Sequence, residues 1–442
     1  MQNGTGTVVD RDTADVVVVG GGLAGLTAAA LLARDGRRVT LYEKARSVGG
    51  RAVTQAHGEF HFNLGPHALY RGGAGIRVLR ELGIAFGGGV PKASGGYAVA
   101  GGVKHTLPGG FVSLLSTGLL RPAGKFEFAR LLTSIQKVDT RAIQHLTVRQ
   151  WLDDAIRQPD VRRLLQALLR LTTYANDPER QSAGAALAQL QLAVTSNVLY
   201  LDDGWQVLVD GLRAAAEKSG VRIETGRRVT AIAHDAAVRG VRLADGTLHP
   251  VGCVIVAGGP TDAAALLTAT PQSPLHRWAE ASVPVRAACL DVGLERLPQP
   301  RATFALGIDR PLYLSVHSAV AKLSPQGGAT IHVAKYLDSA AADAKATEAE
   351  LERLLDLVQP GWRDVVVERR FLPSMIVSHA LTTAADATAG RPEPAVPGID
   401  NLFVVGDWVG SEGWLADASL ASARQAAALV ARMPAVRCGA AA

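Results

Sequence analysis

Three glycines with a fixed spacing are the residues of this sequence that point most directly to chemistry. Gly20, Gly22 and Gly25 form a G-x-G-x-x-G pattern, and Glu43 follows about 20 residues later. The first glycine allows a tight turn, the second lets the backbone approach a pyrophosphate, and the third lets a helix pack closely on a strand. The carboxylate of Glu43 can accept hydrogen bonds from a ribose diol. The pattern predicts a dinucleotide site; the alternative is a glycine-rich turn with a structural role.

The segments around the glycines predict the elements that would hold them in place. Val16–Val19 is a β-branched run short enough for one buried strand, and residues 26–34 are good helix formers that Gly36 closes. Residues 38–42 form a second expected strand, which ends at Glu43. In this order of strand, turn, helix and strand, the amide-lined start of the helix would face the phosphates.

A second glycine pair decides which dinucleotide is expected. Gly49, Gly50 and Arg51 begin six residues after Glu43. Glycines there let a second backbone segment approach the diphosphate, and Arg51 can offset its charge through bidentate hydrogen bonds. The combination of G-x-G-x-x-G with E-x-x-x-x-x-G-G-R resembles the flavoprotein superfamily of amine oxidases, phytoene desaturases and protoporphyrinogen oxidases. In that superfamily the ligand is FAD, and nicotinamide dehydrogenases usually lack the G-G-R extension, so the resemblance implies a flavin.

The resemblance continues near the carboxy terminus. Residues 402–405 predict a buried strand, Gly406 and Asp407 a turn, and residues 416–430 an alanine-rich closing helix. In the resembling family this turn approaches the ribityl and phosphate part of the flavin, which implies that Asp407 accepts hydrogen bonds from ribityl hydroxyls. The start of the closing helix points its amides at the pyrimidine oxygen, where reduced flavin carries negative charge.

The resemblance therefore implies one FAD site built from both ends of the chain. Val229 matches the residue whose main chain contacts the adenine, and residues 254–260 match the strand exit near the pyrophosphate. Non-covalent FAD is expected, because no cysteine stands near His379, where monoamine oxidases carry the cysteine that bonds to the flavin. The predicted cofactor-binding residues are Gly20, Gly22, Leu23, Ala24, Gly25, Glu43, Lys44, Gly49, Gly50, Arg51, Gly65, Pro66, His67, Val229, Gly258, Gly406, Asp407, Leu415 and Ala416.

Catalytic residues are poorly marked, because a flavin itself supplies the difficult step by accepting a hydride at N5. Trp414 lies in GWLADA, which resembles the amine-oxidase segment GYMEGA. In that family the aromatic residue is one wall of a cage beside the flavin. The alternative is that Trp414 packs the start of the closing helix. His379 and His67 are candidates to line the cavity beside the flavin, against solvated or structural histidines. His332 and Tyr336 share one strand face and are further polar candidates, or part of a sheet surface.

The order of the segments predicts an α/β fold with two interleaved domains, because 442 residues are too many for one ordinary domain. The first is a Rossmann-like FAD-binding domain with the GxGxxG motif, formed by residues 12–95, 196–268 and 380–442. The second is a substrate-binding domain, a mixed sheet with a helical cap, formed by residues 96–195 and 269–379.

The helical cap carries the strongest hint about the substrate. Residues 111–195 have apolar positions at helical spacing, and Leu164, Leu165, Leu168 and Leu169 are expected to belong to the core rather than to the pocket. The segment DPERQSA after a long apolar helix resembles the phytoene-desaturase branch. The turn Asp203-Gly204-Trp205 departs from the Gly-Gly-Met that desaturases commonly carry, which leaves the substrate open.

Composition and charge argue against several other classes. Hydrophobic residues make up 48% and charged residues 19% of the chain, as in a soluble globular protein. The net charge of +6 is modest and no dense Lys/Arg block occurs, so no nucleic-acid binding is expected. Residues 1–15 lack a secretory signal, which predicts a cytoplasmic protein. The three cysteines, Cys253, Cys289 and Cys438, are odd in number and widely spaced, which predicts reduced thiols and no metal site. Residues 16–33 favour a buried β–α unit over a membrane span; peripheral membrane contact stays open.

Three functions compete. The first is an FAD-dependent dehydrogenase, desaturase or isomerase that transfers a hydride from an apolar small molecule to flavin N5. The second is an amine oxidase that makes an imine and hydrogen peroxide; a lysine that many such enzymes keep is absent from the matching strand, which carries Arg286 and Asp291. The third is a non-enzymatic flavin-binding or chaperone-like protein. The electron acceptor, oxygen or a quinone, and the oligomeric state are not specified by the sequence.

Overall fold

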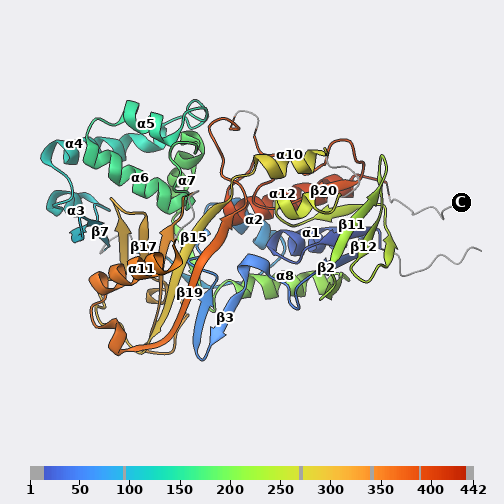
Figure 1. Ribbon diagram of the computed structural model, residues 1–442, viewed down its shortest axis with the longest axis horizontal. Helices are drawn as coiled ribbons and strands as arrows, with labels where there is room; N and C mark the ends of the chain where they lie inside the picture. Colours follow the sequence, from blue (N-terminus) through green and yellow to red (C-terminus); the bar gives the residue numbers. More distant parts are fainter. Residues whose placement is uncertain (1–13, 93–95, 268–271, 339–342, 388–389, 435–442) are drawn as a thin grey trace, which may run out of the picture.

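A five-stranded parallel sheet, assembled from both ends of the chain, forms one half of the molecule (Figure 1). The structure is a computed structural model that describes residues 14–92, 96–267, 272–338, 343–387 and 390–434. In spatial order the strands are β10 (Arg222–Thr225), β2 (Val39–Glu43), β1 (Val16–Val19), β14 (Val254–Val256) and β20 (Leu402–Val404). The chain order reverses between β1 and β14, and ligands of such sheets bind beyond the carboxyl ends of the strands at that point.

Helices cover one face of this sheet, and a small antiparallel sheet covers the other. The helices are α1 (Leu23–Arg34), α2 (Ala74–Glu81), α8 (Gln206–Lys218) and α12 (Leu415–Ala431). The small sheet consists of β11 (Val229–His234), β12 (Val238–Leu243) and β13 (Leu248–Pro250). Its core also includes residues of α9 (Pro260–Ala264) and α10 (Pro274–Ala281). On the helical side Leu26, Leu32 and Leu41 are fully buried, and on the other side Val17 and Val254 are buried. The sheet is therefore apolar on both faces, as parallel sheets are.

The first strand is confirmed as predicted, whereas the helix after it begins earlier than predicted. α1 starts at Leu23 and not at residue 26, because Gly22 is its extended N-cap residue and its carbonyl accepts the first helical hydrogen bond from the Leu26 amide, at 3.0 Å. The strand β2 lies one residue further along the chain than predicted and includes Glu43. Glu43 thus ends the strand inside the sheet.

A seven-stranded mixed sheet forms the other half of the molecule (Figure 1). In spatial order its strands are β19 (Val366–Ser378), β15 (Val285–Leu294), β18 (Ala329–Tyr336), β17 (Leu312–Val316), β16 (Phe304–Gly307), β7 (Tyr97–Ala100) and β8 (Val103–Thr106). The strands β7 and β8 form a hairpin that turns at Gly101 and Gly102, both with positive φ. Helix α11 (Ala344–Val358) packs on this sheet and ends before Pro360.

The predicted helical layer over residues 111–195 is confirmed. It consists of α3 (Phe111–Ser116), α4 (Pro122–Ser134), α5 (Val148–Ala155), α6 (Pro159–Thr173) and α7 (Ala183–Ser196). These helices share their own core, in which Trp151, Leu165 and Leu187 are buried against Leu306 of β16. Short strands connect the layer to the first half: β3 (Thr54–His57), β4 (Phe60–Asn63), β5 (Leu69–Tyr70), β6 (Gly88–Gly89) and β9 (Val198–Leu201).

The two described cysteines, Cys253 and Cys289, are buried free thiols. Burial raises the pKa of the Cys253 thiol to about 12, so it is protonated and unreactive at neutral pH. Cys438 and residues 1–13, which contain most of the predicted leader, lie outside the described residues. Within the described part of the chain, no helix has the length and the apolar composition needed to cross a bilayer.

Candidate flavin and substrate site

One continuous cavity of about 1170 Å³ reaches from the parallel sheet to the helical layer. It begins at the carboxyl ends of β1, β2, β14 and β20 and ends at α6 and α7. Most of the residues predicted to bind a cofactor or to face it line this cavity. They are Gly20, Gly22, Leu23, Ala24, Glu43, Lys44, Gly49, Gly50, Arg51, Pro66, His67, Val229, Gly258, His379, Gly406, Asp407, Leu415 and Ala416.

The glycine turn is shaped for close approach by a ligand. A Cβ added at Gly22 would meet no protein atom within 4 Å, whereas a Cβ at Gly25 would lie 1.9 Å from the Gly20 carbonyl oxygen. Gly22 therefore borders open cavity, and Gly25 serves the packing of α1 on β1. The amide of Gly49 donates to the Gly21 carbonyl at 2.7 Å, which joins the two glycine segments. Gly49 has a φ of 124°, a conformation that favours glycine.

Glu43 holds this turn in place through backbone hydrogen bonds. Its Oε2 accepts from the Gly21 amide at 2.7 Å and its Oε1 from the Ala45 amide at 2.8 Å. The side chain is buried at the wall of the cavity. A carboxylate has further lone pairs, so both oxygens retain acceptor capacity toward the cavity. The predicted ribose role of Glu43 thus comes with a structural role that the sequence pattern did not reveal.

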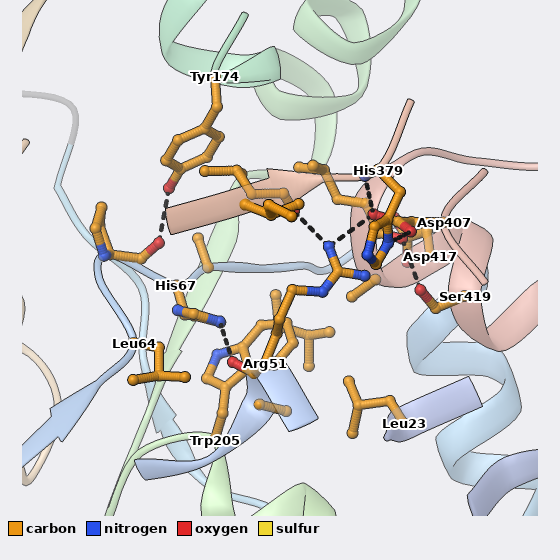
Figure 2. Close-up of a pocket in the computed structure, with 18 of the residues that line it drawn as sticks. Leu23, Arg51, Leu64, His67, Tyr174, Trp205, His379, Asp407, Asp417 and Ser419 are labelled. Carbon is orange, nitrogen blue, oxygen red and sulfur yellow. Dashed lines mark hydrogen bonds and ion pairs between the residues drawn. The ribbon is translucent and has the colours of Figure 1, made fainter. Parts of the chain in front are cut away.

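Asp407 joins the two ends of the chain at the opposite side of the cavity (Figure 2). Its carboxylate accepts hydrogen bonds from Arg51 Nη1 at 2.8 Å, from the His379 amide at 3.0 Å and from His379 Nδ1 at 2.9 Å. Burial alone would raise the pKa of Asp407, but the charge of Arg51 and the hydrogen bond from His379 hold it well below its usual range. Asp407 is therefore a buried anion, and its charge orients both Arg51 and His379.

His67 is a neutral histidine in the cavity wall. Burial lowers the pKa of His67 to about 4. Its Nδ1 lies 3.0 Å from the Gly65 carbonyl oxygen and its Nε2 lies 3.2 Å from the Arg51 carbonyl oxygen. A neutral imidazole has one N–H, so it donates to one of these carbonyls at a time. The ring also packs edge-on against Trp205, at 4.9 Å between centroids.

The end of the cavity under the helical layer is apolar. Leucines of α6 and α7 line it together with tyrosines, and Tyr174 donates to the Pro66 carbonyl at 3.0 Å. Of the four leucines of α6 expected in the core, three are fully buried there and Leu168 is partly buried against them. The expectation that none of the four lines the pocket was wrong for two of them. Leu165 and Leu169 are buried away from the cavity, but Leu164 and Leu168 line it. The apolar end is lined by Phe128, Leu132, Leu164, Leu168, Leu171, Tyr174, Leu190, Ala193, Val194, Tyr200, Phe304 and Tyr313.

Asp417 and Trp205 are wall residues to which the sequence reasoning assigned no role. Asp417 lies in the first turn of α12, where its Oδ1 accepts from the Gly75 amide at 2.7 Å. Its Oδ2 is buried and has no partner among the described residues, and burial raises the pKa of Asp417 to about 6. Trp205 Nε1 is likewise a buried donor without a partner. Asp417 follows directly after Leu415 and Ala416, so its position could have indicated a place in the wall.

Some predicted residues lie elsewhere. Trp414 is the N-cap residue of α12 and is not among the described residues that line the cavity, and the same holds for Gly65. In the described structure Trp414 therefore lies at the start of α12, which agrees with the alternative that the sequence left open. His332 and Tyr336 are buried in β18 behind the cavity, so neither forms a sheet surface. His332 Nδ1 bonds to Asp291 Oδ1 at 2.6 Å.

The surroundings of Asp291 form a closed polar cluster inside the seven-stranded sheet. Cys289 Sγ donates to Asp291 Oδ1 at 2.9 Å, and Arg370 Nε donates to Asp291 Oδ2 at 3.1 Å. Cys289, Asp291 and His332 have ligand atoms within 4.8 Å of one another, as a metal site would require. However, the guanidinium of Arg370 already neutralises Asp291, and Cys289 and His332 Nδ1 both bond to its Oδ1, whereas His332 Nε2 has no partner among the described residues. The cluster is therefore a buried ion-pair network.

Known proteins resemble this chain in sequence and in fold. A phytoene desaturase from Cercospora nicotianae is 27% identical over 267 residues, which cover 52% of this chain and 42% of that protein. This match spans less than half the length of that relative. An oxidoreductase from Methanosarcina mazei has a TM-score of 0.75 at 18% identity, over 92% of this chain and 98% of the other. A putrescine oxidase variant with redesigned cofactor binding has a TM-score of 0.74 at 16% identity, over 95% and 99%.

These two structural matches establish a shared fold alone, since their sequence identities are low. The family assignment comes from a separate comparison, in which residues 23–286 match the model of the family described as flavin containing amine oxidoreductase. The matched region begins just after Gly22 and contains Gly25, Glu43, the G-G-R segment and the helical layer. Because it covers more than half of the chain, the protein belongs to the family of flavin-containing amine oxidoreductases.

Proposed function

We propose that the protein is an oxidoreductase that binds FAD non-covalently and transfers a hydride from an apolar organic substrate to flavin N5. The reaction would be that of a dehydrogenase, desaturase or isomerase of the phytoene-desaturase type. The observation that carries this proposal is the division of the cavity into a glycine-lined end and an apolar end. None of the described residues named above as lining the apolar end carries a charge.

The residues at the glycine-lined end fit FAD. The open space in front of Gly22 and the start of α1 suit a diphosphate, and Glu43 suits a ribose. At the far end, Trp205 Nε1 is an unpaired donor that a polar group of a ligand would satisfy. No cysteine is among the described residues that line the cavity, which supports non-covalent binding. The residues that would hold FAD thus come from the turn after β1, from Val229 and from the start of α12.

Bound flavin would supply the hydride acceptor, and the protein would supply position and environment. The leucines of α6 and α7 exclude water and hold an apolar substrate against the flavin end of the cavity. His67 is neutral at physiological pH, and its one N–H donates a hydrogen bond to the Gly65 or the Arg51 carbonyl, so the ring adds no charge to the cavity wall. The pair of Arg51 and Asp407 keeps the opposite wall rigid and its net charge near zero.

An amine oxidase is the second function to be weighed. A cationic amine would need carboxylates or exposed aromatic faces where it binds. Four carboxylates line the described cavity, Glu43, Asp262, Asp407 and Asp417, and none of them belongs to α6 or α7, which cover its apolar end. Aromatic side chains at the apolar end could face a cation, but the leucines beside them offer no counter-charge, which favours a neutral apolar substrate.

Anaerobic reduction of the flavin tests the proposal. The purified protein should be yellow and should release FAD on denaturation by heat or acid. An isoprenoid polyene or a polycyclic hydrocarbon should bleach the flavin anaerobically, and reoxidation with oxygen or a quinone would identify the acceptor class. Bleaching by amines, with release of peroxide in air, would replace the proposal by amine oxidation. A flavin that dithionite reduces slowly and that no substrate bleaches would instead indicate a non-enzymatic protein.

A further inference from the structure

The outer surface of the helical layer exposes large apolar side chains. Phe111, Val112 and Leu115 lie on one face of α3 and are 75%, 78% and 58% exposed, and Phe126 on α4 is 76% exposed. These four residues are called the α3–α4 apolar face below. Six of the ten large apolar side chains that are exposed in the described chain belong to α3, α4 and α7. Such a concentration of apolar side chains marks an interaction surface.

The α3–α4 apolar face adjoins the mouth of the cavity. The residues directly before α3, Leu107 to Gly109, line the cavity. Leu132 of α4 and Val194 of α7 line it too, yet they are 45% and 59% exposed, so they stand where the cavity opens to solvent. The Nζ of Lys125 donates to the Leu115 carbonyl at 2.6 Å and fixes α4 beside α3. An apolar molecule could therefore pass from this face into the cavity along apolar side chains.

Basic side chains predominate in the segment that carries the same face, although the carboxylate of Asp160 from α6 also lies there, where its Oδ2 accepts from the Arg121 amide at 2.8 Å. Residues 104–137 contain five basic side chains and one acidic side chain. The acid, Glu127, is engaged with the backbone amides of Arg157 and Gln158, both at 2.8 Å. Four of the basic residues, Lys104, Arg121, Arg130 and Lys137, are exposed, and the fifth, Lys125, is half-buried. Cations around apolar and aromatic side chains are the composition of segments that lie in the interface of anionic membranes.

We propose that the α3–α4 apolar face docks onto the surface of an anionic lipid bilayer. Phe111, Val112 and Phe126 would enter the boundary between headgroups and acyl chains, and the surrounding lysines and arginines would contact lipid phosphates. The mouth of the cavity would then face the membrane, so that an apolar substrate dissolved in the bilayer could reach it without crossing water. Docking goes beyond the proposed reaction and can be measured without turnover.

Sedimentation with lipid vesicles tests docking on the full chain with its flavin bound. The protein should sediment with vesicles of phosphatidylcholine and phosphatidylglycerol, and weakly or not at all with phosphatidylcholine alone. The double variant Phe111→Ser/Phe126→Ser should bind about tenfold or more weakly, because two exposed aromatic side chains no longer insert. Arg121→Gln/Arg130→Gln should weaken binding to the anionic vesicles by a similar factor.

The matched control is Leu248→Ser/Val367→Ser. It removes two apolar side chains that are 45% and 57% exposed and that lie outside the helical layer, on β13 and β19. Its vesicle binding should equal that of the wild type, and all variants should keep their flavin and their unfolding midpoint. The proposal is overturned if the wild type ignores anionic vesicles, if it binds neutral ones equally well, or if Phe111→Ser/Phe126→Ser still binds. It is also overturned if that variant turns a dimer into a monomer in light scattering, since the face then belongs to a second copy of the chain.

Discussion

Replacing Gly22 by alanine should separate flavin binding from folding. Gly22 has a φ of −76° and a ψ of −177°, which any residue adopts, and its added Cβ would meet no protein atom within 4 Å. The apoprotein should therefore tolerate Gly22→Ala, and its free energy of unfolding should rise by up to about 1 kcal/mol, because the unfolded chain loses freedom. In the complex, the same methyl group would occupy the space in which the diphosphate approaches the turn.

The expected loss of affinity follows from the contact that the methyl group prevents. A hydrogen bond from a backbone amide to a charged group contributes about 1.5–3 kcal/mol, so losing one weakens binding about 10- to 150-fold. Urea unfolding of the apoprotein gives the stability, and titration of apoprotein with FAD, followed by flavin fluorescence, gives the dissociation constant. Gly25→Ala should behave differently, because its Cβ would lie 1.9 Å from the Gly20 carbonyl oxygen and would destabilise the apoprotein itself.

Gly110 provides the matched control. It is also the extended N-cap residue of a helix, α3, and its added Cβ would also meet no atom within 4 Å, but it does not line the cavity. Gly110→Ala should change stability about as Gly22→Ala does, because the unfolded chain loses the same freedom, but it should leave FAD affinity as in the wild type. If Gly22→Ala bound FAD as tightly as the wild type does, the diphosphate would not lie against this turn, and the assignment of the glycine-lined end to FAD would be wrong.

Three further substitutions test other parts of the site. Glu43→Ala leaves the amides of Gly21 and Ala45 without their acceptor, so urea unfolding should show a loss of about 1–3 kcal/mol, and FAD titration should show weaker binding. The pKa of Asp417 is raised to about 6 from its usual 3.8, so the native state loses stability as the pH rises from about 4 to 6. Asp417→Asn should remove that loss. It should therefore stabilise the apoprotein by up to about 3 kcal/mol above pH 7 and by little at pH 4. Equal pH profiles for variant and wild type would contradict the raised pKa. Leu168→Trp fills the apolar end, so anaerobic reduction by an apolar substrate should slow about tenfold or more while dithionite reduction is unchanged.

The local sequence was enough to predict the glycine turn and its neighbours. Strand, turn and helix form within about 20 residues, and each glycine has a steric reason that depends on its immediate neighbours. The helix start was three residues off, because Gly25 lowers the local helix propensity although the tertiary packing of α1 on β1 requires a glycine there. The helical layer was predicted for the same local reason, from its apolar periodicity.

What the sequence could not determine depends on contacts between distant residues. Arg51 and Asp407 are 356 positions apart and meet only because β1, β14 and β20 share a sheet. Periodicity gave all four leucines of α6 an apolar environment, but the orientation of the helix against the cavity decided that Leu164 and Leu168 line it. Likewise, the raised pKa of Asp417 results from burial against Gly75 and its neighbours, which no local pattern encodes.

The sequence by itself thus determined the kind of ligand site and the elements that build it, because short-range sterics and propensity act within a few residues. The tertiary structure decided which side chains face one another, how much water reaches them and, through that, the charges that they carry. Those properties depend on burial and on long-range contacts, whose free energies belong to the packed molecule and not to any one segment.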